Sequence, residues 1–408
     1  MRAIVVAVLL LFATPCWGAD KAVELFRQGM IAVEASQKPG VSEAMRDNLL
    51  DKAIAAFREM LVADPTLVRV RLELARAFFL KGEDGLARQH FERVLAGGVP
   101  QAVAHNVGRY LAAIRARRRW DLHAGFALAP DTNIGGASDQ RIIYIYGLPF
   151  ERDAEDLATS GIGLSVWTGG EYQYPLREDL RLRAGASGSR REYSGSRFDQ
   201  TFVSGHAGPR WLIDRNTEAS VLASAQRRWS AGAPDHDALG VRLEAGRRLT
   251  PRVTAHTRAS WHDRDYRTRD EFDGPTVDVS LGGAWVVTPT VRTDGALGWG
   301  RDRTETERWR HERRWVRAGV TVALPRGFTV GGNAELRATD YEGNWFPHTA
   351  GEPREDETYS ARLSVHNRAL AWQGFSPQLS LVHEVRRTNA QLYDYERTGG
   401  ELRFVRVF

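Results

Sequence analysis

Cysteine is almost absent from this 408-residue sequence, whose single cysteine is Cys16. A lone thiol excludes a disulfide framework within the chain and a zinc site built from paired cysteines. Lysine is also scarce: of the 56 Lys and Arg residues only four are Lys, and all four lie before residue 82. After residue 13 no stretch reaches the roughly 18 uninterrupted apolar residues that a transmembrane helix needs. The sequence therefore does not encode a bundle of membrane-spanning helices.

The first eighteen residues have the layout of an export signal. Arg2 precedes an apolar run from Ala3 to Ala13, and small residues lead up to Gly18. This order is typical of a secretory signal peptide, whose apolar part is too short to span a bilayer as a mature helix. We predict a signal peptide over residues 1–18, cleaved after Gly18.

The charge balance is basic, with a formal net charge of +5. Nucleic-acid binding is the simplest explanation of an arginine excess. Here, however, the arginines are scattered through alternating segments rather than clustered, and the chain is expected to be exported. We therefore expect no nucleic-acid partner.

Residues 19–118 show helical spacing and contain few glycines. Two units repeat at a period of about 34 residues, with equivalent positions at Ala53 and Ala87, Phe57 and Phe91, and Pro65 and Pro100. Small and aromatic residues in the packing positions, with proline closing each unit, resemble the tetratricopeptide repeat (TPR). An unrelated pair of helical hairpins is the alternative. Such arrays generally offer a concave surface to another protein.

Apolar and polar residues alternate with a period of two over residues 119–408, which predicts strands. The same alternation occurs in soluble antiparallel sandwiches, so the connections between the strands must distinguish a sandwich from a membrane barrel. We predict fourteen strands, for example at 217–229 and 237–249, with short connections alternating strictly with long ones. An even strand number with this alternation is typical of bacterial outer-membrane barrels.

The sequence thus predicts a multidomain protein. An N-terminal all-α domain of TPR-like helical repeats (19–118) is followed by a C-terminal antiparallel transmembrane β-barrel of about 14 strands (119–408). In such barrels the short turns and both chain ends lie in the periplasm. We therefore expect the barrel in the outer membrane and the helical domain in the periplasm.

Alternation also assigns side chains to the two faces of the barrel wall. The charged residues expected to line the lumen are Arg181, Arg183, Arg242, Glu244, Arg258, Arg292, Asp294 and Arg337. A lining of mixed sign has two possible roles. It can guide a folded or partly folded protein, or its ion pairs can keep the wall rigid.

The last ten residues, Gly399–Phe408, alternate and end on an aromatic residue. They are similar to the C-terminal strand of bacterial outer-membrane barrels, and we predict that Phe408 is the terminus needed for barrel assembly. This strand must pair with the first one, because each unpaired backbone group in hydrocarbon costs several kcal/mol.

A short polar motif follows the first predicted strand: Pro130-Asp131-Thr132-Asn133-Ile134, then Gly135-Gly136. Asp and Asn side chains suit a structured turn. Helical repeats, a fourteen-stranded barrel and this stretch together resemble the surface lipoprotein assembly modulators, called Slam. The junction motif of that family is carried here by Pro130, Asp131, Asn133 and Ile134. Gly135 stands where many relatives are expected to have Asn.

The resemblance implies an outer-membrane translocon that delivers lipoproteins or soluble secreted proteins from the periplasm to the cell surface. The expected partners are a secreted protein or lipoprotein substrate, a periplasmic chaperone, the barrel-assembly machinery and outer-membrane lipid. No cofactor, metal or catalytic residue is expected. The sequence has no P-loop, and His311-Glu312 lacks the second histidine of a zinc-protease helix.

Other functions remain open at this point. An exopolysaccharide export pore also joins helical repeats to a barrel, and a general solute porin could carry a helical periplasmic domain. A barrel enzyme would need Ser or Asp beside a histidine at the barrel mouth. The available histidines, none of which is singled out by its spacing, are His123, His206, His262, His366 and His383.

Overall fold

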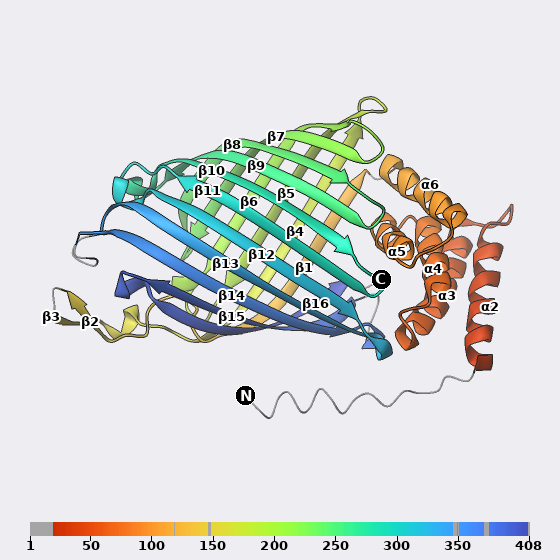
Figure 1. Ribbon diagram of the computed structural model, residues 1–408, viewed down its shortest axis with the longest axis horizontal. Helices are drawn as coiled ribbons and strands as arrows, with labels where there is room; N and C mark the ends of the chain where they lie inside the picture. The colour runs from red at the N-terminus through yellow and green to blue at the C-terminus, as the bar shows by residue number, and fades with distance from the viewer. Residues whose placement is uncertain are drawn as a thin grey trace.

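The computed structural model contains a helical segment followed by a barrel (Figure 1). It describes residues 19–117, 119–145, 148–345, 349, 351–370 and 375–406. The predicted signal peptide and Phe408 lie outside these residues.

Five α-helices precede the barrel in the described part of the chain: α2 (Ala19–Ser36), α3 (Glu43–Ala63), α4 (Val68–Lys81), α5 (Asp84–Ala96) and α6 (Gln101–Arg117). None of them is long and apolar enough to cross a membrane. Phe57 and Phe91, two equivalent positions of the predicted repeat, are fully buried in one core. Phe91 stacks on Tyr110 with ring centroids 4.9 Å apart. The helices therefore share one core, whereas the TPR-like repeat stays a prediction.

The strands form a closed antiparallel barrel in which β1 pairs with both β4 and β16. Its strands are β1 (Trp120–Asp131), β4 (Gly161–Pro175), β5 (Leu180–Glu192), β6 (Gln200–Leu212), β7 (Thr217–Ser230), β8 (Ala233–Arg248), β9 (Val253–Tyr266), β10 (Gly274–Val286), β11 (Val291–Asp302), β12 (His311–Ala323), β13 (Phe328–Asn344), β14 (Pro353–Asn367), β15 (Phe375–Thr388) and β16 (Tyr395–Arg406). The described residues thus confirm the predicted antiparallel barrel of 14 strands, closed by the first and last strands.

A second, smaller sheet lies in the loop between β1 and β4. It consists of β2 (Ile142–Ile145) and β3 (Leu148–Glu151), which pair with each other and project from the barrel end opposite the helices (Figure 1). We call the end near the helices the helical end and the opposite end the loop end. The hairpin was not predicted from the sequence.

The predicted strict alternation of short and long connections is wrong at one place. Strands β7 and β8 are joined at the loop end by only Ala231 and Gly232, whose φ angles are 50° and 80°. Two residues with positive φ are the geometry of a tight hairpin turn. The pairing of β7 with β8 extends beyond the predicted strand ends to Ser230 and Ala233, because backbone hydrogen bonds do not require alternation of apolar and polar side chains.

The outer face of the barrel is apolar along its whole circumference. Its exposed side chains include Leu182, Val203, Leu243, Leu281, Leu297, Val316, Leu336, Leu363, Leu381 and Leu402. A closed barrel leaves no sheet edge to desolvate, so such a band is stable in hydrocarbon and unfavourable in water. The barrel is therefore a membrane-spanning one.

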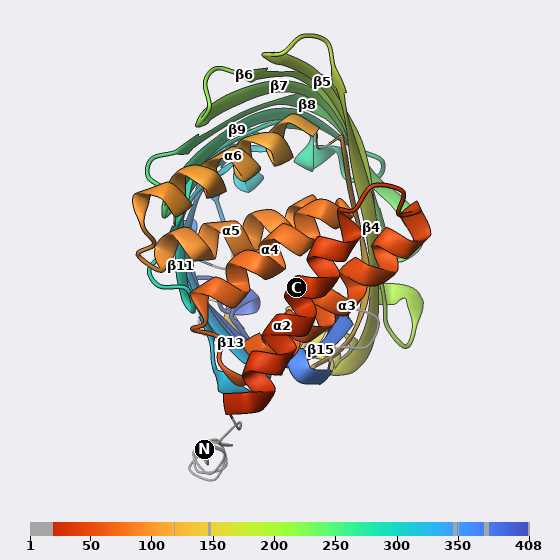
Figure 2. The same ribbon diagram turned by 90° about the vertical axis from the view of Figure 1, so that its right-hand side faces the viewer.

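The helices lie across the helical end of the barrel (Figure 2). Arg115 of α6 attaches them to the turn between β6 and β7. Its Nη1 donates to the carbonyl oxygens of Asp214 and Arg215 at 3.1 and 2.5 Å, and its Nη2 donates to that of Thr217 at 3.1 Å. Burial lowers the pKa of Arg115, while the nearby Glu218 carboxylate raises it. The guanidinium therefore acts as a clamp between the two parts of the chain.

Replacing Arg115 by Gln should loosen this attachment. A hydrogen bond to a charged group contributes about 1.5–3 kcal/mol, and the clamp makes several of them. We expect faster hydrogen exchange in α6 and in residues 213–216, measured by mass spectrometry on the protein in lipid nanodiscs. Arg109→Gln, at an exposed position of the same helix, is the matched control and should leave both segments unchanged. Equal exchange in the two variants would contradict the clamp.

Candidate functional site

The eight predicted lumen charges belong to the inner face of the wall. Arg183 is central among them: its Nη2 donates to Glu171 Oε2 at 2.6 Å and its Nη1 donates to Glu244 Oε2 at 2.9 Å. Nη1 also donates to Ser220 Oγ at 3.0 Å. These contacts join β4, β5, β7 and β8 on one side of the wall, because side chains two residues apart on a strand, and those of paired residues on neighbouring strands, face the same side.

The remaining predicted charges spread around the wall. Arg242 Nε and Arg258 Nε each lie 3.3 Å from Glu244 Oε1. Arg337 pairs with Glu335, which also accepts from Arg317. The other three are Arg181, which is buried, Asp294, which lines a cavity, and Arg292, which lies at the helical end near Arg93 of α5.

Arg93 and Arg292 bring two positive charges together where the helices meet the barrel. Burial, and secondarily the Arg292 guanidinium, lower the pKa of Arg93 to about 10. Arg93 therefore remains charged at neutral pH. This contact opposes the docking of the helices, whereas the clamp made by Arg115 and the ion pair between Arg248 of β8 and Glu92 of α5, 3.6 Å apart, favour it.

Ion pairs connect that clamp to the lumen. Glu218 Oε2 lies 3.2 Å from Arg115 Nη2 and accepts a 2.5 Å hydrogen bond from Arg210 Nη2. Arg210 Nη1 also donates to Gln173 Oε1 at 2.7 Å, and Gln173 Nε2 donates to Glu171. A continuous polar path thus runs from α6 to the centre of the lumen charges.

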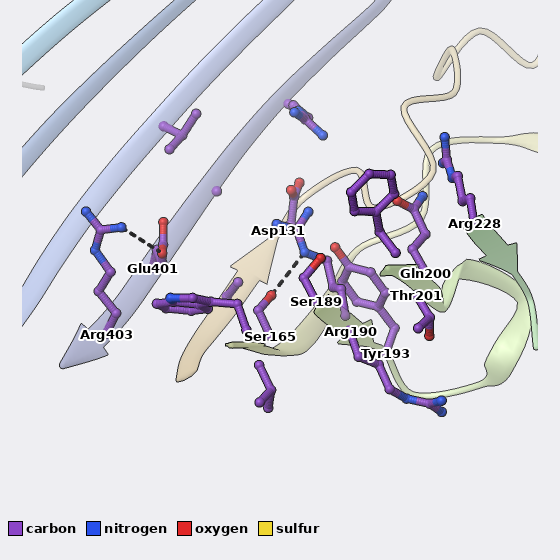
Figure 3. Close-up of a pocket in the computed structure, with 18 of the residues that line it drawn as sticks. Asp131, Ser165, Ser189, Arg190, Tyr193, Gln200, Thr201, Arg228, Glu401 and Arg403 are labelled. Carbon is purple, nitrogen blue, oxygen red and sulfur yellow. Dashed lines mark hydrogen bonds and ion pairs between the residues drawn. The ribbon is translucent and has the colours of Figure 1, made fainter. Parts of the chain in front are cut away.

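A cavity of about 930 Å³, which we call the main cavity, lies inside the barrel. Figure 3 shows Asp131, Tyr193 and Arg228 around it, with the Glu401–Arg403 ion pair on one wall. A second cavity of about 490 Å³ adjoins it, since residues of β14, β15 and β16 line both. The lumen is therefore polar and rich in arginine.

The junction motif forms a clasp between the first and last strands. Asn133 is 1% exposed, and its Nδ2 donates to the carbonyl oxygens of Glu396 at 3.2 Å and Ala137 at 2.8 Å. Its Oδ1 accepts from the Ala137 amide at 3.1 Å. Thr132 N donates to the Thr398 carbonyl at 3.1 Å, and Thr398 N donates to Thr132 Oγ1 at 2.9 Å. We call Thr132 and Asn133, with these partners, the seam clasp.

The other motif residues support the clasp. Asp131 Oδ1 accepts from the Asn133 amide at 2.9 Å, and Ile134 N donates to the Thr159 carbonyl at 2.8 Å. Pro130 lies close to Gly400, where an added Cβ would be 3.2 Å from the proline ring. Pro130 has no amide hydrogen to give to the ladder, which is why proline is normally confined to edge strands.

Next to the clasp, paired residues of β1 and β16 form the seam. The paired residues are Ala127 with Arg403, Leu128 with Leu402, and Asp131 with Gly399. Residues 120–126 pair with β4, and β16 pairs with β15 down to Arg406. The described pairs thus close this seam at the loop end.

Two aromatic rings pack together on the outer face of this seam. Phe126 and Phe404 contact each other with centroids 5.4 Å apart, and both are exposed on the outer face. On the inner face of the same seam, Asp131, Glu401 and Arg403 line the main cavity. The seam therefore separates an apolar exterior from a charged interior.

A cluster of aromatic residues fixes the loops at the loop end. Trp345 is fully buried between Trp309 and Tyr393, with ring centroids 4.9 and 5.3 Å away. The Arg354 guanidinium lies 3.7 Å from the Tyr393 ring centroid and pairs with Asp356 at 2.6 Å. These residues come from three separate loops or strand ends. Their packing holds the loops over β11–β16 together.

Sequence reasoning missed the clasp and the aromatic cluster. Pro130 inside a predicted strand was one available signal, because it points to an irregular ladder. A second available signal was an aromatic residue followed directly by Asp, a pair that recurs in three loops. In each loop the Asp side chain accepts a hydrogen bond from a backbone amide on the other side of the hairpin: Asp199 from Tyr193, Asp273 from Tyr266 and Asp394 from Thr388.

The described residues contain no group of three or more His, Cys, Asp or Glu placed to hold a metal ion. Ser224 Oγ and His262 Nε2 lie 2.9 Å apart in the lumen. In the described part of the chain, however, no carboxylate is hydrogen-bonded to His262 to orient it, and Gln226 shares the same ring nitrogen at 3.1 Å. This pair lacks the third member that a triad requires.

Comparison with known sequences identifies relatives over the whole barrel. The model of the family described as "Surface lipoprotein assembly modifier" matches residues 120–408. A protein of Neisseria meningitidis serogroup B named surface lipoprotein assembly modifier 1 is 25% identical over 401 residues, covering 95% of this chain and 76% of the relative. A namesake from Haemophilus influenzae is 20% identical over 354 residues, covering 85% of this chain and 72% of the relative.

The solved structures with a similar fold include two outer-membrane proteins of low sequence identity. The DcaP channel of Acinetobacter baumannii is 10% identical and has a TM-score of 0.43, covering 71% of this chain and 98% of that one. OmpT of Vibrio cholerae is 8% identical with a TM-score of 0.38, covering 70% of this chain and 97% of that one.

Proposed function

The chain belongs to the surface lipoprotein assembly modifier family, and from this premise we propose that it is an outer-membrane translocon that delivers lipoproteins to the cell surface. The observation that carries the proposal is the match of the family to the complete barrel, residues 120–408. The protein resides in the outer membrane, where closed antiparallel barrels with an apolar outer band are found. Soluble secreted proteins are a further class of cargo.

The proposed orientation puts the helical end in the periplasm and the loop end at the cell surface. Short turns at the helical end and longer loops at the other support it, since outer-membrane barrels keep their short turns in the periplasm. The helices over the barrel mouth would then meet cargo, or a chaperone that carries it, before the lumen does. The polar contacts of Glu218 with Arg115 and Arg210 would connect the cargo-binding helices to the barrel wall.

The proposed route for polypeptide is the lumen. Its cavities of about 930 and 490 Å³ are lined mainly by polar and charged side chains. Such a lining keeps an extended, hydrated segment in a polar environment, so its backbone groups need not be stripped of hydrogen bonds. An arginine-rich lining also favours acidic segments by simple electrostatics.

Deletion of the gene in its own host tests the proposal. We expect surface lipoproteins to remain in the cell but to lose their accessibility to protease and antibody on intact cells, and a plasmid copy of the chain to restore it. Unchanged surface exposure of every lipoprotein and secreted protein would contradict the proposal. A large, steady conductance of the pure protein in planar bilayers, open without cargo, would instead favour a solute porin.

A further inference from the structure

The arginines that line the main cavity fall into two groups. Among the described residues, seven arginines line it, against two carboxylates, Asp131 and Glu401. Four of the seven have a close carboxylate partner. The pairs are Arg190 with Glu192 at 2.5 Å, Arg264 with Asp302 at 2.8 Å, Arg362 with Glu401 at 2.6 Å, and Arg397 with Glu384 at 3.3 Å. The charges of these four arginines are therefore balanced within the protein.

The other three are Arg191 of β5, Arg228 of β7 and Arg403 of β16, which we call the cavity arginines. Arg191 Nε donates to Ser165 Oγ at 3.0 Å, and in the described chain no carboxylate forms an ion pair with this guanidinium. The Asp131 carboxylate, which lines the same cavity, balances at most one of the three charges. The cavity thus has an excess of positive charge.

Arg228 and Arg403 have only distant carboxylates. Each lies 3.9 Å from a carboxylate oxygen, that of Asp235 for Arg228 and that of Glu401 for Arg403. This separation is too long for a hydrogen bond. Both carboxylates are bound at 2.6 Å by another arginine, which is Arg269 for Asp235 and Arg362 for Glu401. Arg228 and Arg403 therefore keep donors that a ligand can use.

The cavity arginines are accessible from the cavity and point into it from separate parts of the wall. The side chains of Arg228 and Arg403 are 40% and 33% exposed, and Arg191 is also exposed. Figure 3 shows Arg403 and Arg228 at opposite sides of the cavity. The planar guanidinium group binds a carboxylate through two parallel hydrogen bonds. The cavity therefore offers several carboxylate-binding groups to one ligand.

The arrangement favours a chain that carries several carboxylates over a single small anion. Such a chain can contact arginines on opposite walls at once, and each further contact is then intramolecular and raises the affinity. The volume of about 930 Å³ falls within the range of about 300–1,000 Å³ typical of ligand pockets. Trp167 and Phe202 add apolar surface to the lining, which suits the uncharged parts of a peptide.

We propose that the main cavity is a binding site for an acidic segment of the cargo polypeptide, whose carboxylates are bound by Arg191, Arg228 and Arg403. This site rests on the proposed function, in which the polypeptide passes through the lumen. The cavity is lined by Tyr193 and Gln200, which flank the loop between β5 and β6. The segment would therefore be held near the loop end, the exit side under the proposed orientation.

Isothermal titration calorimetry on the purified full chain in lipid nanodiscs tests the site. The probes are an acetylated and amidated hexapeptide of alternating Gly and Glu and the same peptide with Gln in place of Glu. We expect the Glu peptide to bind at least about ten-fold more tightly than the Gln peptide, a difference of about 1.4 kcal/mol. Inorganic phosphate at the concentration of the peptide should not displace it.

Variants of equal charge make the result specific. Arg191→Gln should bind the Glu peptide more weakly than wild type, and with Arg228→Gln and Arg403→Gln added the two peptides should bind equally. Arg337→Gln is the matched control and should bind like wild type. Arg337 also faces the lumen and is 43% exposed, but it pairs with Glu335 at 2.5 Å and lines neither cavity. Heat-modifiable mobility in electrophoresis verifies that each variant is folded.

Arginine footprinting on the wild-type chain locates the bound peptide without any substitution. Phenylglyoxal modification, mapped by mass spectrometry, should be slowed at the cavity arginines by saturating Glu peptide and should be unchanged at Arg337. Equal binding of the two peptides, equal losses in Arg191→Gln and Arg337→Gln, or modification that the peptide leaves unchanged would overturn the proposal. Displacement by phosphate would identify a small-anion site and would also overturn it. Binding needs no translocation, so a failure of the proposed function appears separately, in the deletion strain.

Discussion

Asn133→Ala should lower the free energy of unfolding of the barrel by about 2–4 kcal/mol, because each buried group left without its partner costs about 1–3 kcal/mol. The substitution removes both donors and the acceptor of a side chain that is 1% exposed. It leaves the carbonyl oxygens of Glu396 and Ala137, and the Ala137 amide, without their partner. Urea unfolding of the protein in lipid bilayers, followed by tryptophan fluorescence, measures the change.

Two variants make this result specific for the seam clasp. Asn133→Asp keeps an acceptor for the Ala137 amide but loses the donor to Glu396, so its stability should lie between wild type and Asn133→Ala. Asn216→Ala, in an exposed turn at the helical end, should unfold like wild type. If Asn133→Ala matched Asn216→Ala, the motif would be a passive turn and the clasp would be wrong.

Arg183→Met should destabilise the barrel by about 3 kcal/mol, the lower end of the range of about 3–5 kcal/mol for removing one partner of a buried ion pair. The side chain is 15% exposed and holds Glu171 and Glu244, which are 17% and 21% exposed. Methionine keeps the apolar stem but leaves both carboxylates without their shared guanidinium. The lower end applies because water in the lumen solvates the two groups in part.

The same strand offers a control for Arg183. Arg190 also pairs with a glutamate, Glu192, at 2.5 Å, but its side chain is 56% exposed. Arg190→Met should cost no more than about 1 kcal/mol, as is usual for exposed pairs. A triple variant with Arg183→Met, Glu171→Gln and Glu244→Gln should regain part of the loss, because the two carboxylates that Arg183 neutralises are then uncharged. Equal losses in the two single variants would show that the lumen charges do not brace the wall.

The sequence predicted the barrel because its signal is local and repeated. Alternation assigns Arg183 and Glu244 to the inner face without knowledge of any partner, and turn residues such as Thr250-Pro251 mark the strand ends. Closure by the first and last strands then follows from the cost of an open edge in hydrocarbon.

The seam could not be predicted in the same way, because its features are non-local. Asn133 and Glu396 are 263 positions apart, and no periodicity relates them. Likewise, Trp345 is a loop aromatic in the sequence and becomes a buried core residue only when Trp309 and Tyr393 are brought to it.

Reconstitution of the purified chain tests its role as a translocon most directly. Liposomes that carry the chain with its helices outward are given a lipoprotein whose surface exposure is lost in the deletion strain, and proteinase K is then added outside. We predict that cargo becomes protected within the liposomes only when the chain is present. Cargo that stays as accessible as in liposomes without the chain would contradict the account.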